Sequence, residues 1–202
     1  QRPVHVVAES GTGADLLARI VAPGMAAALG QPIVIENLPG AGGAAAAGRV
    51  AKSAPDGYTA LLLDSGHVAS PTMAESPPYE PVSMVATMPL VVLAGPRAGF
   101  GSLQGLIGVA GHNPGELSLA SVGAVGPGRL AAELLFQRAG IRLMNLTFKT
   151  GPYAVTATAL NETQVLVEAA ASALGQVGNR TLVPLAVTSA SRLAGLPDVP
   201  TV

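Results

Sequence analysis

The sequence predicts an α/β fold with two lobes, and two observations carry this prediction. Short runs rich in β-branched residues alternate with longer Ala- and Leu-rich stretches along most of the 202 residues, which is the pattern of strands alternating with helices. The alternation stops in a Pro-rich middle segment and restarts after the connector 95–101, Gly-Pro-Arg-Ala-Gly-Phe-Gly. Because such connectors are typical of domain boundaries, we expect lobe 1 over residues 1–96, lobe 2 over 97–185 and a return segment toward lobe 1 over 186–202.

Lobe 1 is expected to contain three strands joined by two helices. The first helix has apolar residues at helical spacing and stops at Gly30. Those apolar residues are Leu16, Leu17, Ile20 and Val21. The expected ranges are strand 4–7, helix 15–29, strand 32–35, a turn at 39–43, an Ala-rich helix through 51 and strand 58–63. This order predicts a parallel sheet with right-handed crossovers.

The rest of the chain is expected to repeat the alternation after an irregular segment. Residues 71–81 are rich in Pro, and 82–93 should be a strand through the core. The further expected elements are helix 103–111, strand 117–120, a Gly-rich loop, helix 128–139, strand 144–147, helix 153–160, strands 165–167 and 182–188, and an extended tail over 196–201.

Composition excludes several classes of protein. The 11 Lys and Arg residues are balanced by 12 Asp and Glu without any basic run, and aromatics make up 3%, which argues against nucleic-acid binding. The absence of cysteine excludes thiolate nucleophiles, disulfides and Cys-based zinc sites. No apolar run reaches the about 20 residues of a membrane helix. If the protein is exported, we expect its signal peptide to be absent from this chain.

Three loops rich in Gly, Ser or Thr follow separate expected strands. They are Glu9–Asp15, Asp64–His67 and Ser121–Gly126. Ligands of parallel sheets bind at the carboxyl ends of strands, where backbone amides and helix N-termini can hold an anion. Any one loop could instead be a tight turn in which Gly merely permits positive φ. Because three such loops are spread over both lobes, we interpret them as a binding site in a cleft.

A dinucleotide site and a catalytic site are the competing interpretations. Gly11-Thr-Gly13 follows a strand and Glu36 ends the next one, but Leu16 replaces the third Gly of the dinucleotide fingerprint. The chain has three histidines and no Gly-x-Ser-x-Gly elbow. We therefore expect no enzyme, no metal and no cofactor, while an α/β enzyme or domain that binds a nucleotide or a phosphorylated ligand stays an alternative.

The sequence resembles the receptors of the tripartite tricarboxylate transporter family, the Bug-type solute-binding proteins. The most specific matches are the hexapeptides Ala54-Pro-Asp-Gly-Tyr-Thr59 and Leu196-Pro-Asp-Val-Pro-Thr201. The other matching stretches are Arg2–Val7, Asp15–Arg19, Leu29–Asn37, Pro39–Gly43, Asn113–Leu117 and Leu185–Ser189.

The resemblance implies a periplasmic-binding-protein-like fold of type II, a two-lobed Venus flytrap with a ligand cleft. Members of this family continue beyond the equivalent of Val202, so the C-terminal part of lobe 1 is expected to be missing from this chain. The implied function is the capture of a small carboxylate in the periplasm for membrane transporter subunits, by a monomer without nucleic acid. A sensor that does not take part in transport stays an alternative. The implied ligand-binding residues are Ser10, Gly11, Thr12, Gly13, Asp15, Ser65, Gly66, His67, Ser121, Val122, Gly123, Ala124 and Gly126.

Two departures from the family pattern affect the expected ligand. Glu9 and Ser10 replace a Pro- and aromatic-rich loop, which adds a negative charge to a site for anions. Val122 and Ala124 stand where relatives often have Ser and Asn, which removes side-chain donors. The only Arg close to the three loops is Arg129, so recognition should rest on amides and dipoles, with modest affinity. A different or less anionic ligand therefore stays open.

Overall fold

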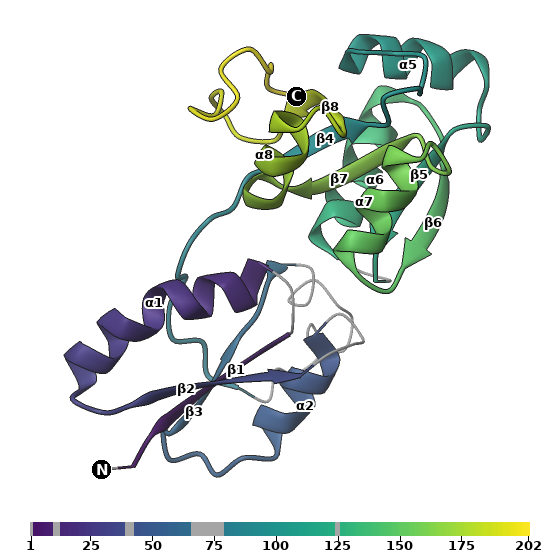
Figure 1. Ribbon diagram of the computed structural model, residues 1–202. Coiled ribbons are helices and arrows are strands. Elements are labelled where there is room, and N and C mark those ends of the chain that lie inside the picture. Colours follow the sequence, from purple (N-terminus) through teal and green to yellow (C-terminus); the bar gives the residue numbers. More distant parts are fainter. Residues whose placement is uncertain (1, 10–12, 39–42, 66–78, 124–125) are drawn as a thin grey trace. The chain divides into compact units, whose positions relative to one another are not determined.

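The chain folds into two compact units, Gln1–Ser83 and Met84–Val202. The computed structural model describes all residues except 1, 10–12, 39–42, 66–78 and 124–125 (Figure 1). Each unit is a β-sheet with helices packed against it, so the expected α/β fold is confirmed. The lobe boundaries expected at residues 96 and 185 stay predictions.

Unit 1 is built on a three-stranded parallel sheet. Its elements are β1 (Val4–Glu9), α1 (Gly13–Leu29), β2 (Ile33–Leu38), α2 (Ala44–Ala51) and β3 (Thr59–Leu62). The strand order is β2-β1-β3, and β1 runs parallel to both neighbours, with Val4 opposite Ile33 and His5 opposite Thr59. The parallel sheet expected from the sequence is confirmed. Because β1 is the central strand, its residues Val6, Val7 and Ala8 are all buried.

Helix α1 packs on unit 1 through small residues. Ala14 and Ala18 are its buried positions, whereas Leu16 and Ile20 are 50% and 66% exposed. The helix was predicted from its apolar spacing, and its existence is confirmed. Leu17 and Val21 are half-buried and share the face of these alanines at helical spacing. Only this half of the predicted apolar set packs on the sheet.

The first family hexapeptide forms a turn before β3. The Tyr58 amide donates a hydrogen bond to Asp56 Oδ1 at 3.1 Å, and Gly57 has a positive φ of 79°. Arg2 forms an ion pair with Asp56 at 2.7 Å and lies over the Tyr58 ring, 4.3 Å from its centroid. These hydrogen bonds hold the pKa of Asp56 below its usual range. The motif therefore fixes the entry into β3.

Unit 2 is a larger, mixed sheet. Its elements are β4 (Leu90–Ala94), α5 (Leu103–His112), β5 (Ser118–Val122), α6 (Pro127–Ala139), β6 (Met144–Phe148), α7 (Gly151–Ala159), β7 (Val165–Ala169), α8 (Ala170–Gly178) and β8 (Val183–Val187). The strand order is β6-β5-β7-β4-β8. Strand β5 runs parallel to β6 and β7, and β4 runs antiparallel to β7 and β8. The carboxyl ends of β5, β6 and β7 therefore share one edge.

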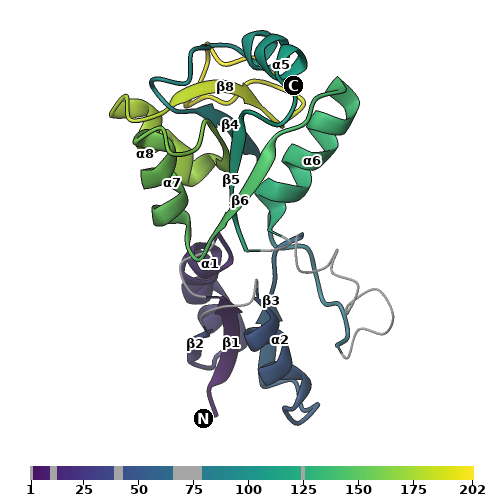
Figure 2. The same ribbon diagram turned by 90° about the vertical axis from the view of Figure 1, so that its right-hand side faces the viewer.

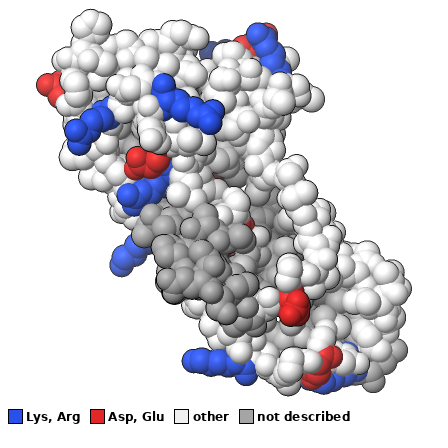
Figure 3. Space-filling view, turned by 180° about the vertical axis from the view of Figure 1, so that it is seen from behind, with Lys and Arg blue, Asp and Glu red and all other residues white. Residues whose placement is uncertain are grey.

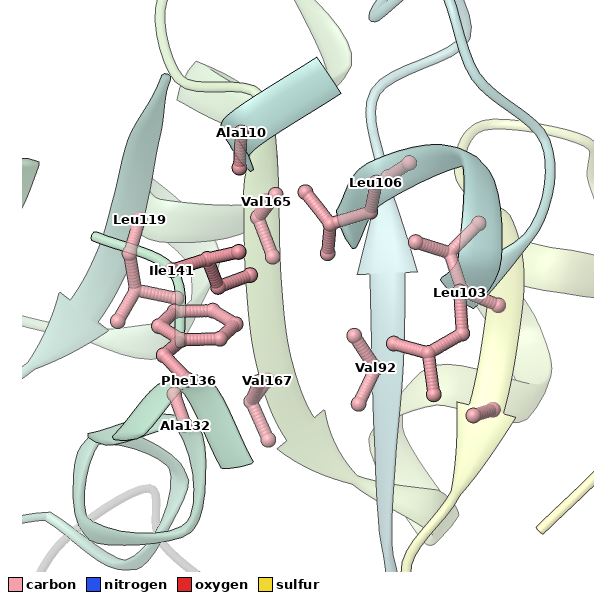
Figure 4. Close-up of a cluster of buried hydrophobic side chains, with 13 residues drawn as sticks. Val92, Leu103, Leu106, Ala110, Leu119, Ala132, Phe136, Ile141, Val165 and Val167 are labelled. Atoms are coloured by element: carbon pink, nitrogen blue, oxygen red, sulfur yellow. The ribbon is translucent and has the colours of Figure 1, made fainter. Parts of the chain in front are cut away.

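Two cores cover the two faces of this sheet. Helix α6 lies on one face and α7 and α8 on the other (Figure 2). Phe136 of α6 packs with Leu119, Ile141 and Val165 on the first face (Figure 4). On the second face, Leu166 packs with Ala154 of α7 and Ala173 of α8. Alternate residues of β7 thus point to opposite faces of the sheet. Val165 and Val167 face α6, and Leu166 faces α7 and α8.

Two expectations for the elements around unit 2 are wrong. The strand expected over 82–93 begins only at Leu90, and Val82 and Met84 are 94% and 79% exposed. Helix α8 was not expected. It follows β7 directly, and its N-cap residue Ala169 makes no side-chain capping bond, so the usual polar signal of a helix start is absent.

The second family hexapeptide begins with a turn, in which the Val199 amide donates to the Leu196 carbonyl at 3.2 Å, and its end pairs with β8. The Val187 amide donates to the Pro200 carbonyl at 2.8 Å, and the Val202 amide donates to the Val187 carbonyl at 3.0 Å. Leu196 and Val199 are buried in the core on the α8 side. The tail expected to be extended over 196–201 is therefore extended only at its end, where residues 200–202 pair with Val187, because residues 196–199 form a turn.

Candidate ligand-binding site

In unit 1 the first predicted loop leads into α1. Gly13 is the first residue of α1, and the Asp15 carboxylate accepts a hydrogen bond from Arg19 Nε at 2.9 Å. Arg19 Nη2 also donates to Asn37 Oδ1, at the end of β2, at 2.7 Å. Asp15 therefore orients the Arg19 guanidinium, which links α1 to β2. It also places a negative charge at the N-terminus of α1, where the helix dipole stabilises it.

Several predicted site residues lie outside the described residues. They are Ser10, Gly11, Thr12, Gly66, His67 and Ala124. Ser65 is described and exposed, and it follows β3 by a few residues. The assignment of Ser65 and of these six residues to a ligand site stays a prediction.

In unit 2 the third predicted loop leaves the end of β5. Ser121 is buried, and its hydroxyl lies 3.5 Å from that of Thr147, its partner on β6. Gly123 has a positive φ of 68°, and its amide donates to the Phe148 carbonyl at 3.2 Å. The structure thus brings Ser121, Val122 and Gly123 to the shared carboxyl edge of β5 and β6.

The start of α6 lies unusually close to the strands. A Cβ atom on Gly126, the N-cap residue, would be 2.5 Å from the Val122 carbonyl oxygen, and one on Gly128 would overlap the Val167 carbonyl oxygen. The first hydrogen bond of the helix runs from the Leu130 amide to Gly126. The amides before Leu130 lack intrahelical acceptors, so the N-terminus of α6 can receive an anion at this edge.

Sequence reasoning missed one acidic residue at the same edge. Glu168 is the next-to-last residue of β7, and its Oε1 accepts a hydrogen bond from the Ala169 amide at 2.9 Å. Burial raises the pKa of this carboxyl above its usual value. The sequence signal was available, because Glu168 directly follows the apolar run Val165-Leu-Val167.

Two groups considered in the competing interpretations, Glu36 and His112, make contacts within their own surroundings. Glu36, the candidate ribose-binding acid, forms an ion pair with Arg49 at 3.2 Å and lies 3.9 Å from His5 Nδ1. His112 Nδ1 lies 2.7 Å from the Gly108 carbonyl of its own helix. Among the described residues, no group of three His, Asp or Glu side chains could hold a metal ion.

A separate pocket of about 230 Å³ lies in unit 2 on the α6 face. Its lining is mostly apolar, with Leu134 and Leu135 of α6 and Val92 of β4, and Arg138 is its one charged residue. None of the predicted site residues lines it, so we do not place the site there.

Charged side chains are sparse on the face of the molecule drawn in Figure 3, and the basic ones do not gather in a patch. This agrees with the balanced composition. None of the described helices is both long and apolar enough to cross a membrane.

The fold is that of periplasmic solute-binding proteins. The chain superposes on R. palustris Rpa4515 with adipate with a TM-score of 0.89 at 28% identity, over 100% of this chain and 71% of that one. It also superposes on MatC from Rhodopseudomonas palustris with bound malate with a TM-score of 0.85 at 27% identity, over 99% and 71% of the two chains.

The chain belongs to the receptors of the tripartite tricarboxylate transporter family. The model of this family matches residues 17–202. It is 35% identical to a UPF0065 protein of Bordetella bronchiseptica over its full length, and it spans 62% of that relative. It is 32% identical to protein BugT of Bordetella pertussis over 99% of its length, which corresponds to 64% of BugT. The Bug-type resemblance is thereby confirmed.

Proposed function

We propose that the protein is a periplasmic receptor that captures a small carboxylate and delivers it to membrane transporter subunits. The carboxyl edge of unit 2 supports this proposal most directly, because the Ser121 hydroxyl and the amides at the start of α6 both lie there. A carboxylate could accept hydrogen bonds from both kinds of donor.

Relatives of known structure support the same ligand class. Two proteins that share this fold at 27–28% identity hold adipate and malate. Both are carboxylates, and in both cases the chain matches nearly all of its own length. We therefore propose that this protein also binds a carboxylate. The contributing loops would be Ser10–Gly13, Ser65–His67 and Ser121–Gly126.

The test uses two serines of one strand. Ser121 and Ser118 are both buried, but Ser121 lies at the carboxyl edge of β5, whereas Ser118 lies at its other end and bonds Gln164 Oε1 at 3.0 Å. Thermal-shift screening of mono- and dicarboxylates, followed by calorimetry, gives the affinity of the wild-type chain. A hydrogen bond to a charged group contributes about 1.5 kcal/mol or more, so Ser121→Ala should weaken binding about tenfold.

Ser118→Ala is the control. It should lower stability through the lost bond to Gln164 and leave the affinity unchanged. The carboxylate proposal fails if no aliphatic, aromatic or amino carboxylate shifts the melting temperature. The placement of the site fails if Ser118→Ala and Ser121→Ala affect binding equally.

A further inference from the structure

Glu168 is an acidic side chain at the carboxyl end of the central strand of unit 2. Its strand, β7, lies in the middle of the order β6-β5-β7-β4-β8. The two residues before it, Leu166 and Val167, are buried against opposite helices. A carboxylate at this position is not required by the sheet, since β7 is otherwise entirely apolar.

The side chain of Glu168 points to the α7 face. Leu166 packs on that face, and alternate residues of a strand share a face. A Cβ atom on Gly151, the first residue of α7, would lie 3.5 Å from Glu168 Oε2. The last paired residues of β5 and β7 are Ala120 and Leu166, and an added Cβ on Gly128 of α6 would overlap the carbonyl oxygen of Val167. The start of α6 therefore lies next to the backbone of β7 just before Glu168.

No cationic side chain neutralises this carboxylate among the described residues, whose ion pairs do not include Glu168. The titratable groups on the helices packed against β7 are Arg129, Glu133 and Arg138 on α6, and Tyr153 on α7. Helix α6 covers the other face of the sheet, and its Arg129 lies 3.8 Å from Glu133. Helix α8, strand β5 and strand β4 carry no titratable group.

The partial burial of Glu168 has an energetic consequence. Removal of a carboxylate from water penalises its charged form, and a nearby cation offsets that penalty. The direction of the pKa shift of Glu168 agrees, since burial raises it. A ligand that brought a positive charge to this edge would therefore be favoured over one that brought only negative charge.

Unit 1 shows the same arrangement independently. Its central strand β1 is apolar apart from His5 and also finishes with a glutamate, Glu9. Each unit thus has an acid at the carboxyl end of its central strand, next to a loop predicted to bind the ligand.

We propose that Glu168 is a specificity-determining residue that selects solutes carrying an ammonium group beside their carboxylate. This inference rests on the proposed function. The carboxylate of the solute binds the amides at the start of α6, and its ammonium group donates to the carboxylate of Glu168. A purely structural role would differ: Glu168 would act only on the N-terminus of α7, and its replacement would change stability but not the choice of ligand.

The experiment compares ligands that differ by one ammonium group. Calorimetry measures the affinity of the chain for succinate against aspartate, glutarate against glutamate, and 3-phenylpropionate against phenylalanine. The wild-type protein should prefer the amino member of at least one pair about tenfold or more, as for a charge-assisted hydrogen bond. Glu168→Gln should weaken binding of that member about tenfold and tighten binding of its partner without the amine.

Glu162→Gln is the control, because it removes the same charge near the opposite end of β7, and it should leave each ratio unchanged. The inference is overturned if the wild-type protein binds succinate, adipate or malate but prefers no amino member. It is also overturned if Glu168→Gln leaves the ratio intact or changes only the melting temperature. If no carboxylate of either kind binds, the proposed function itself is wrong.

Discussion

Gly126→Ala tests the close approach of α6 to the sheet. The added Cβ would lie 2.5 Å from the Val122 carbonyl oxygen, about 1 Å closer than ordinary van der Waals contact. Gly126 has φ −63° and ψ 153°, which alanine adopts freely, so the cost is steric and not conformational. Overpacking of this kind costs about 1–3 kcal/mol, and alanine caps a helix less well than glycine by several tenths of a kcal/mol.

We therefore expect the free energy of unfolding to fall by about 2–3 kcal/mol, measured by urea denaturation followed by circular dichroism. The matched control is Gly108→Ala, in the interior of α5 in the same unit, where an added Cβ meets nothing within 4 Å. It should stabilise the protein by up to about 1 kcal/mol. If Gly126→Ala is as stable as the wild-type protein, the tight contact between α6 and β5 is wrong.

Two further predictions concern the core and the pH dependence. Leu166→Ala removes a fully buried side chain and should cost about 2–5 kcal/mol in urea denaturation; a loss below that of Leu134→Ala, at an exposed position, would contradict the assigned core. Burial raises the pKa of Glu168 above 4.5, so the folded protein binds this proton more tightly than the unfolded chain, and stability falls as pH rises from 4.5 through the raised pKa. Glu168→Gln should thus gain stability over the wild-type protein at neutral pH and gain none below pH 4.5, and a pH-independent difference would count against this.

The sequence predicts unit 1 well because its information is local. The β-branched runs at Val4–Val7 and Pro32–Ile35 form parallel strands, and the turn at Asp56 and Gly57 depends on neighbouring residues. The strand predicted over 82–93 was wrong in its first part, because hydrophobicity alone does not separate a buried strand from an exposed extended segment. Helix α8 was missed because it begins without a polar cap.

The candidate site was predictable in outline only. Gly123 and Gly126 lie where a loop after a strand should place them, at the carboxyl edge of β5. The surroundings of Glu168 depend on Gly151 of α7 and Gly128 of α6, which are distant from it in sequence. Asp15 could be recognised as an acid in the first turn of α1, but its bond from Arg19, which also donates to Asn37, needed the structure.

Binding of a carboxylate by this protein is tested most directly by a calorimetric comparison of carboxylates with nucleotides. The chain is titrated with adipate, malate and the amino carboxylates, and in parallel with NAD and ATP. We predict saturable binding of at least one carboxylate and none of either nucleotide. Binding of a nucleotide, with no heat from any carboxylate, would contradict the account.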